Sequence, residues 1–301
     1  MRSLSVIRAP KELLIEDLGR HGFGRYGVTE AGACDRGSLK LANRLVGNPE
    51  SAPALEMLLG PAEFLCHDNL IFASTGAKLK LEVDGVQQPQ NCAIYVKAGS
   101  KLEPSMPSRG VRSYLALHGG VFVEPVLGSS SYDTLGQIGP KPLRSGDLIE
   151  VGPPTTFVQS ELAVAPVSEL ANHPTLRGWW GPRVSWFSAN SVAKLQTISL
   201  RVTERANRVG VCLQGGDLVR TRDDELPPEG VLRGSIQVTP AGDTVLFLAD
   251  HPVTGGYPTL GVLDTWSCDR AAQLRPGDIL RLQLRQCCAD ASHGAIEIKQ
   301  G

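Results

Sequence analysis

Short apolar segments separated by glycine and proline turns are the feature that most constrains the fold of this chain. The 301 residues include 33 glycines and 21 prolines spread along the whole length, and aromatic residues make up only 5%. Apolar runs that end at such turns are typical of β-strands, because a strand needs only a few residues to cross a small domain. We therefore expect strands at residues 70–74, 79–83, 93–98, 113–119, 147–152, 235–239, 244–249 and 278–284.

Signals for tight turns and helices are fewer. The sequence Val83-Asp84-Gly85-Val86 predicts a hairpin, because Asp-Gly tolerates the positive φ angles of such turns. A helix is expected after Asp35, which can cap it, and before Gly47-Asn48-Pro49, which stops it. A second, shorter helix is expected to begin near Asp269 and to end before Pro276.

The length and one irregular stretch predict two lobes. A chain of 301 residues is about two domains long. Residues 153–176 are rich in Pro, Ser and Thr without clear periodicity, so they are expected to form a linker. The prediction is a mainly β fold with a few helices (α+β): an N-terminal β-rich lobe at 1–152 with one capped helix, and a C-terminal β-rich lobe at 177–288.

Composition argues against several functional classes. Lys and Arg total 30 against 31 Asp and Glu, so the chain lacks the basic excess that nucleic-acid binding needs. No apolar run approaches the roughly 18 residues of a membrane helix, and the N-terminal segment has acidic residues instead of an apolar signal block. The seven cysteines are odd in number and contain no C-x-x-C, which favours reduced thiols and no metal site. We expect a soluble cytoplasmic protein without nucleic-acid or membrane partners.

A glycine-rich segment at residues 19–36 is the first candidate site. Its glycines would let the backbone approach a ligand, and Arg20, Arg25 or Arg36 could hold a carboxylate or phosphate as a fork. The alternative is a surface loop whose arginines pair with Glu30 and Asp35.

A second cluster follows the strand expected at 113–119. Gly119-Gly120 and the Ser/Thr-rich residues 129–134 supply N–H and O–H donors suited to an oxyanion. The alternative is a tight corner in a barrel, with His118 as a core or edge histidine. Nothing in the spacing decides between them.

The third cluster lies at residues 249–258. Asp250 could orient His251 as a general base. Equally, Asp250 and Thr254 could cap the turn while Tyr257 packs against it. No phosphate loop, nucleophile elbow, zinc motif or dinucleotide fingerprint accompanies these clusters.

Taken together, the clusters resemble a known family. The chain resembles the biotin-dependent carboxyltransferase-like family, which includes the C subunit of the prokaryotic 5-oxoprolinase, the carboxyltransferase part of urea amidolyase (also labelled allophanate hydrolase subunit 2) and the KipA regulators. The segments that carry the resemblance, between residues 19 and 278, are GRHGFGRYGV, EAGACDR, LANRLVGNP, ALEMLLG, RSYLALHGGV, VLGSSSYD, LRSGD, GSIQV, LADHPVTGGYPT and AQLRPGD.

The resemblance implies cyclophilin-like β-barrel character, site residues and partners. By the resemblance, catalytic residues are Gln237, Asp250, Thr254 and Tyr257. The residues expected to bind substrate are Arg20, Asp35, Arg36, Arg112, Gly119, Gly120, Ser129, Ser131, Gly255 and Gly256. The implied partners are a protein like KipI or the B subunit of 5-oxoprolinase, and a protein like the A subunit. ATP would act through the complex, and biotin would arrive only on a partner chain.

Four polar segments depart from the family pattern. Lys78 stands where the family usually has Asp, and Ser130 stands in a loop that usually carries Arg. Asn207 replaces a usual Asp, and His251 replaces a usual Arg. Loss of arginines alters anion recognition, because histidine and serine do not reproduce the guanidinium fork.

The resemblance implies a role in hydrolysis of a cyclic amide. The expected role is that of a component similar to the C subunit of an ATP-dependent 5-oxoprolinase complex, which converts 5-oxo-L-proline to L-glutamate and is active only in complex. Two alternatives stay open: a biotin-dependent carboxyltransferase component acting on urea or a related small amide, and a non-catalytic KipA-like binding partner of a KipI-like protein.

Overall fold

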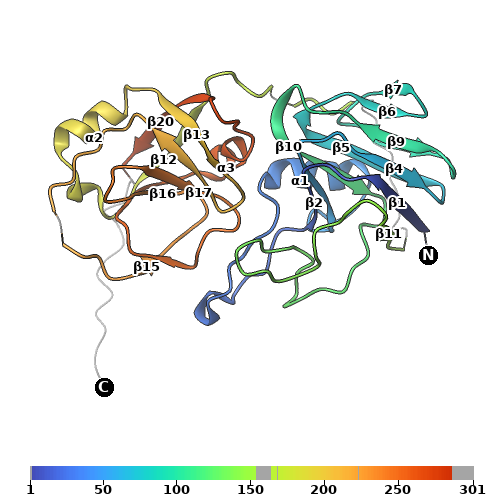
Figure 1. Ribbon diagram of the computed structural model, residues 1–301, viewed down its shortest axis with the longest axis horizontal. Coiled ribbons are helices and arrows are strands. Elements are labelled where there is room, and N and C mark those ends of the chain that lie inside the picture. The colour runs from blue at the N-terminus through green and yellow to red at the C-terminus, as the bar shows by residue number, and fades with distance from the viewer. Residues whose placement is uncertain (1, 154–163, 168, 223, 287–301) are drawn as a thin grey trace, which may run out of the picture.

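The chain folds into two lobes that lie side by side (Figure 1), a two-sheet sandwich and a closed β-barrel. The computed structural model describes residues 2–153, 164–167, 169–222 and 224–286. The predicted mainly β fold with barrel character is confirmed. The domain limits stay a prediction, because residues 154–163, 168 and 287–301 lie outside the described residues.

The N-terminal lobe contains two antiparallel sheets. The first runs in the order β11 (Leu148–Val151), β1 (Arg2–Arg8), β4 (Glu63–Cys66), β9 (Lys101–Pro104), β6 (Leu81–Val83), β7 (Val86–Gln88). The second runs in the order β2 (Glu12–Glu16), β3 (Ala54–Leu58), β10 (Arg109–Leu117), β5 (Leu70–Lys78), β8 (Ile94–Val96). The predicted hairpin is confirmed, since Val83 pairs with Val86 across Asp84 and Gly85, at φ 50° and 77°.

Successive side chains of a strand point to opposite faces of the sheet, so alternate residues of β10 pack against different neighbours. Leu115 and Leu117 of β10 point into the core between the two sheets. Tyr114 and Ala116, one residue out of step, pack under helix α1 (Arg36–Leu45) with Leu39. The predicted helix is confirmed, because Asp35 accepts a capping hydrogen bond from the Ser38 N–H at 2.9 Å.

The C-terminal lobe is a barrel closed by one parallel pairing. Its order is β12 (Thr175–Trp180), β19 (Thr259–Leu263), β16 (Ser235–Val238), β17 (Thr244–Phe247), β14 (Gly210–Gln214), β13 (Leu200–Ala206), β20 (Ile279–Arg285), and β20 pairs in parallel with β12. Closure leaves no open sheet edge in the barrel, and leucines such as Leu176, Leu246 and Leu280 fill its interior.

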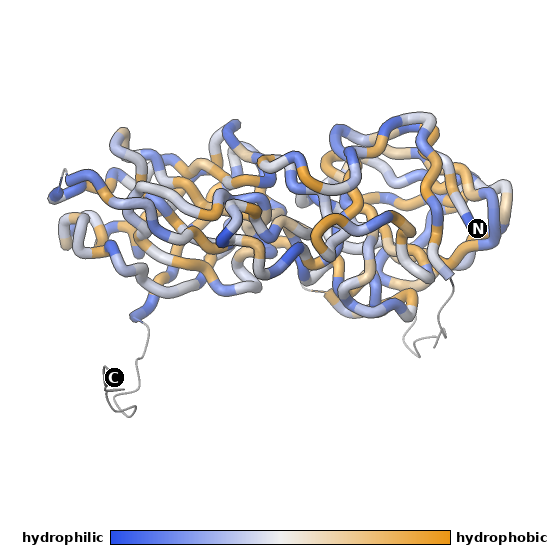
Figure 2. The backbone as a smooth tube through the Cα atoms, turned by 90° about the horizontal axis from the view of Figure 1, so that it is seen from below, coloured by the Kyte–Doolittle hydropathy of each residue, from blue (hydrophilic) through white to orange (hydrophobic). Residues whose placement is uncertain are grey.

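Small elements complete the fold. A two-stranded ribbon pairs β15 (Glu229–Gly230) with β18 (Thr254–Gly255), and the short helices are η1 (Gly24–Tyr26), η2 (Val184–Trp186), α2 (Ala189–Leu195) and α3 (Thr265–Ala271). Figure 2 shows apolar and polar residues alternating along the chain in both lobes. Among the described residues, no helix is long and apolar enough to span a membrane.

The start of α3 corrects one prediction. The helix begins at Thr265, before Asp269, because Asp264 caps it by accepting the Ser267 N–H at 2.7 Å. The first turn carries the exposed Trp266, which obscures the apolar periodicity expected of a helix. Asp269 lies within the helix and faces α1 of the other lobe across the seam between them.

Replacing the cap of α3 tests this boundary. We expect Asp264→Ala to lower the free energy of unfolding by about 1 kcal/mol, because the Ser267 N–H loses its acceptor. Urea unfolding measures the change, with the exposed Thr265→Ala as control. Equal effects of both substitutions would place the helix start elsewhere.

Candidate functional site

Parts of the three predicted motif clusters meet at the seam between the lobes. We call residues 19–35 loop 1, residues 126–139 loop 2 and residues 249–258 loop 3. The Thr29 hydroxyl of loop 1 donates to Asp133 of loop 2 at 3.1 Å. Thr134 of loop 2 donates its N–H and hydroxyl to Asp250 of loop 3, at 3.0 and 2.6 Å. Loops 1 and 2 project beside the barrel in Figure 1 (blue and green, lower centre).

Arg208 of the barrel binds carboxylates of both lobes in the middle of this seam. Its Nε and Nη2 form a bidentate pair with Asp250, at 2.9 and 3.0 Å. Its Nη1 donates to Glu56 of β3, and its Nη2 donates to the Gly32 carbonyl at 2.6 Å and lies 3.3 Å from Glu16 of β2. Arg208 is only 2% exposed, so the pairs are shielded from solvent.

Glu56 extends this ion cluster into the sandwich. Its Oε2 accepts the Tyr114 hydroxyl at 2.7 Å and the Cys34 N–H at 3.0 Å, and its Oε1 lies 3.4 Å from Nε of Arg112. Burial, with the charge of Glu56 next to it, raises the pKa of Tyr114 well above its usual range. The tyrosine therefore stays a neutral donor that anchors the carboxylate.

The pKa values of Glu16 and Asp250, the other two carboxyl groups of the cluster, are shifted in opposite directions. Burial, opposed by Arg208 and increased by Glu56, raises the pKa of Glu16 well above its usual range. Burial would also raise the pKa of Asp250, but Arg208 and Thr134 hold it below its usual value.

Gln273 connects the lobes through its amide. Its carbonyl oxygen accepts the N–H groups of Val111 and Arg112, both at 3.0 Å, and its Nε2 donates to Asp35 at 2.7 Å. The resemblance placed Asp35 and Arg112 among substrate-binding residues, and the structure brings them together around Gln273. Arg112 also donates to the Ala272 carbonyl.

Asp269 of α3, in the barrel lobe, caps the first turn of α1 in the sandwich lobe. Its two oxygens accept the N–H groups of Arg36 and Gly37, each at 3.0 Å, and Arg233 donates to it at 2.6 Å. A carboxylate stabilises these unpaired N–H groups of the first helical turn. The same negative charge lies near Asp35.

Asp35 is the one predicted site residue with a pKa shifted into the range of biological pH. Burial and the Asp269 charge raise the pKa of Asp35 to about 6. It lines a cavity of about 250 Å³ between α1, α3 and part of the predicted linker (Val167 and Leu170), together with Ser38, Arg44 and Asn91. A carboxyl with such a pKa can take up and release a proton near neutral pH, as acid–base catalysis requires.

Arg20, Ser129 and Ser131 hold loops 1 and 2 together below the surface. The hydroxyls of Ser129 and Ser131 donate to Asp17 at 2.7 and 2.6 Å, and Arg20 donates to the Ser131 carbonyl. Arg20 is 1% exposed, and its Nε and Nη1 have no hydrogen-bond partner among the described residues. These buried side chains therefore stabilise the conformation of loops 1 and 2.

Gly119 and Gly120 form a corner of the sandwich. The Gly119 N–H donates to the Asn48 side chain at 2.8 Å and the Gly120 N–H to the Leu117 carbonyl at 2.7 Å, so both donors are engaged. Gly119 has φ 101°, and a Cβ there would lie 2.5 Å from the Gly152 carbonyl oxygen. This close approach requires glycine, and His118 beside it is buried.

The residues predicted to be catalytic do not all lie at one site. Gln237 is buried, donates to the Thr259 hydroxyl at 3.2 Å and packs against Gly255, where a Cβ would lie 3.0 Å from its Oε1. Thr254 is exposed at the start of β18. Asp250, in contrast, belongs to the ion cluster of the seam.

Tyr257 and Gly256 line a separate hollow. Its volume is about 670 Å³, and its wall includes Arg220, Asp224 and Glu225. Tyr257 is 44% exposed there. The structure thus places Tyr257 apart from the contacts of Asp250 and Gln237.

The sequence analysis missed several residues that build the seam. Arg208, Glu56, Glu16 and Asp269 did not appear among the predicted site residues. One signal was available: Glu16 and Glu56 are acidic residues within the apolar segments ELLIE and ALEML. A carboxylate inside a buried strand requires a partner.

Comparisons with known proteins agree with this architecture. A family model described as "Carboxyltransferase domain, subdomain A and B" matches residues 26–284. This chain belongs to that family. The resemblance found in the sequence is therefore confirmed.

Members of this carboxyltransferase-domain family differ in length. The chain is 34% identical over 263 residues to the 5-oxoprolinase C subunit of Escherichia coli (strain K12), covering 86% of this chain and 84% of that protein. It is 29% identical to urea amidolyase of Saccharomyces cerevisiae over 286 residues, 87% of this chain but 15% of that protein. The crystal structure of TTHA0988 superposes with a TM-score of 0.86 at 32% identity, over 94% of this chain. This chain spans about half of that solved chain, 55% of its length.

Removing Arg208 tests the ion cluster. We expect Arg208→Met to lower the free energy of unfolding by about 3–5 kcal/mol, because Asp250 and Glu56 are left buried without a counter-charge. Arg205→Met is the matched control: Arg205 is exposed and pairs with Asp243 at 2.7 Å, so its loss should cost less than about 1 kcal/mol. Similar urea-unfolding values for the two variants would contradict this role.

The raised pKa of Asp35 predicts a pH dependence of stability. The folded protein holds a proton on Asp35 up to about pH 6, whereas the unfolded chain loses it near the ordinary aspartate pKa of 3.8. Protonation therefore favours the folded state, and this contribution is lost as pH rises from about 4 to 6.

Asp35→Asn should remove that contribution while leaving an oxygen that can cap α1. Relative to the unsubstituted protein, the variant should gain up to about 1.4 kcal/mol of unfolding free energy per pH unit between pH 4 and 6. Urea unfolding at several pH values measures this, with Asp147→Asn on the exposed turn as control. Parallel stability curves would refute the shift.

Proposed function

We propose that this chain acts as the C subunit of an ATP-dependent 5-oxoprolinase complex that converts 5-oxo-L-proline to L-glutamate. The observation that carries the proposal is its similarity to the E. coli 5-oxoprolinase C subunit, which extends over 86% of this chain and 84% of that protein. Similarity along both chains favours a shared role over a shared fold alone. The relative is named as one subunit of several, which supports partner chains; we take these to be a B-type or KipI-like protein and an A-type protein.

Asp35 and its surroundings support acid–base chemistry on a small amide. Opening a lactam requires polarisation of its carbonyl and a proton for the departing nitrogen. The cavity of about 250 Å³ presents Asp35, Ser38, Asn91 and Arg44 to a molecule of that class. In this proposal Asp35 holds and delivers the proton, while Gln273 and Ser38, which donate to it, set its orientation.

The cavity at Asp35 is too small for ATP. The cavity at Asp35 measures about 250 Å³, below the roughly 300–1,000 Å³ of sites for drug-sized ligands. The sequence also contains no glycine-rich phosphate loop. In this proposal ATP acts through the complex with the partner subunits.

A carboxyltransferase role is the second candidate. The description of the family and the similarity to urea amidolyase favour it. Carboxyl transfer to urea needs the same kind of site, because the acceptor is again a small amide nitrogen next to a carbonyl. Biotin would then be carried by a partner chain and enter at the seam.

Reconstitution with the cognate A and B subunits tests the proposed function. We expect ATP-dependent release of glutamate from 5-oxo-L-proline only when this chain is present, because its seam supplies the acid–base group. Each component is omitted in turn as a control. An assembled complex that releases no glutamate rejects the proposal and leaves the carboxyltransferase or a non-catalytic KipA-like role, which urea with a carboxybiotin donor then separates.

Asp35→Asn in the same complex tests the residue. We expect the rate of glutamate release to fall about a hundredfold or more, since an amide cannot transfer the proton. Asp147→Asn should leave the rate unchanged, and size-exclusion chromatography verifies assembly of both variants. A normal rate with Asp35→Asn would remove Asp35 from the chemistry.

A further inference from the structure

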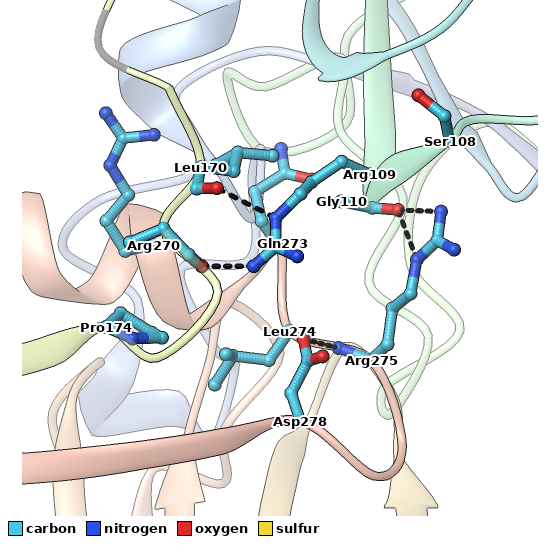
Figure 3. A pocket seen from close by; sticks show the side chains of 11 residues that line it. Ser108, Arg109, Gly110, Leu170, Pro174, Arg270, Gln273, Leu274, Arg275 and Asp278 are labelled. Atoms are coloured by element: carbon cyan, nitrogen blue, oxygen red, sulfur yellow. Dashed lines mark hydrogen bonds between the residues drawn. The ribbon is translucent and has the colours of Figure 1, made fainter.

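Three cavities of the seam meet at one residue, Leu170. The cavity at Asp35 has a volume of about 250 Å³, and a neighbouring cavity of about 220 Å³ lies between the start of β10 and the turn after α3 (Figure 3). A third cavity, of about 300 Å³, lies next to Lys78. Among the described residues, Leu170 is the one that lines all three cavities. It therefore forms a wall between them.

Hydrogen bonds and close packing fix the position of Leu170. Arg109 donates its Nε to the Leu170 carbonyl at 2.8 Å (Figure 3), and its Nη2 donates to the Ala171 carbonyl. The Leu170 side chain lies against the backbone of Gly110, where a Cβ would be 2.7 Å from Cδ1 of Leu170. Glycine allows this close approach, and its φ of 76° also favours glycine at this position. The wall is therefore held at both its main chain and its side chain.

Leu170 borders the side chain that orients Asp35. The same Cβ position at Gly110 would lie 2.7 Å from the side-chain oxygen of Gln273, so Leu170 and Gln273 pack over one glycine. The Nε2 of Gln273 donates to Asp35 at 2.7 Å. The side chain of Leu170 has no atom that donates or accepts a hydrogen bond, so it acts on a ligand beside Asp35 through its volume.

The volume of the cavity at Asp35 depends on this wall. At about 250 Å³ the cavity is smaller than the roughly 300–1,000 Å³ of sites for drug-sized ligands, which suits a small cyclic amide. Joined to either neighbouring cavity, it would fall within that range. Leu170 is therefore the residue that keeps the cavity at Asp35 small.

We propose that Leu170 determines substrate size at Asp35: it admits a lactam as small as 5-oxo-L-proline and excludes one that is extended at its carboxyl group. The inference rests on the proposed function, since it takes Asp35 as the group that acts on the lactam. An extension would have to enter a neighbouring cavity, and the Leu170 side chain blocks that path. The backbone of Leu170 cannot move aside without losing the hydrogen bonds from Arg109.

Enlarging the cavity in the reconstituted complex tests the wall. The substrates are 5-oxo-L-proline, which opens to L-glutamate, and 5-oxo-L-prolyl-L-alanine, which opens to L-glutamyl-L-alanine. Each carries one carboxylate, so the two differ in size and not in charge. We expect Leu170→Ala to raise kcat/KM for the longer substrate about tenfold or more relative to the shorter one, through a lower KM.

Leu148→Ala is the matched control, because it removes the same atoms from an exposed side chain of β11. It should leave the ratio of the two kcat/KM values unchanged. An unchanged ratio with Leu170→Ala would overturn the proposal. So would equal kcat/KM values of the unsubstituted complex for the two substrates.

A binding measurement separates this inference from the proposed function. If the unsubstituted complex does not open 5-oxo-L-proline, the proposed function fails, and thermal unfolding of the whole chain with each lactam then tests the wall. A rise in Tm with the longer lactam in Leu170→Ala alone supports the wall, because a ligand that binds the folded state stabilises it. Equal responses of the variant and the unsubstituted chain overturn it. If Leu170→Ala does not fold or assemble, Leu170→Val decides by the same criteria.

Discussion

The arrangement of the two lobes depends on one buried guanidinium. Arg208 leaves the barrel and reaches Glu56 and Glu16 in the sandwich while it also holds Asp250 of its own lobe. Buried ion pairs contribute little net stability, but losing one partner is costly. Sliding the lobes would separate these charges in a dry environment, so the cluster fixes their register. Asp35 and Asp269 depend on that register, because their hydrogen bonds cross the same seam.

Local sequence patterns predicted the parts of the fold that local physics determines. The apolar runs located strands such as β5 and β20, and Asp35 with Gly47 marked both ends of α1. The start of α3 was misplaced because its first turn exposes Trp266, so no apolar stripe marks it. Strand order in a closed barrel could not be predicted, since partners such as β12 and β20 are far apart in sequence.

The site was predictable only in part, for the same reason. The three glycine-rich loops were identified from the sequence, and the structure brings them to one seam. What holds them there was not visible: Arg208 and Glu56 are 152 positions apart, and Gln273 and Asp35 are 238 apart. An acidic residue in an apolar strand indicates a buried charge, but its partner is distant in sequence and becomes its neighbour only in the folded chain.

Three residues that depart from the family pattern, Ser130, His251 and Lys78, have different structural surroundings. Ser130 is buried and donates its backbone N–H to Asp17 at 2.7 Å. Burial lowers the pKa of His251, so loop 3 carries a neutral ring there at neutral pH. Lys78 is exposed beside Arg109 in a cavity on the linker side. Cationic groups are thus absent at two positions of the motif loops, whereas Lys78 and Arg109 line a cavity together with Val167 and Leu170.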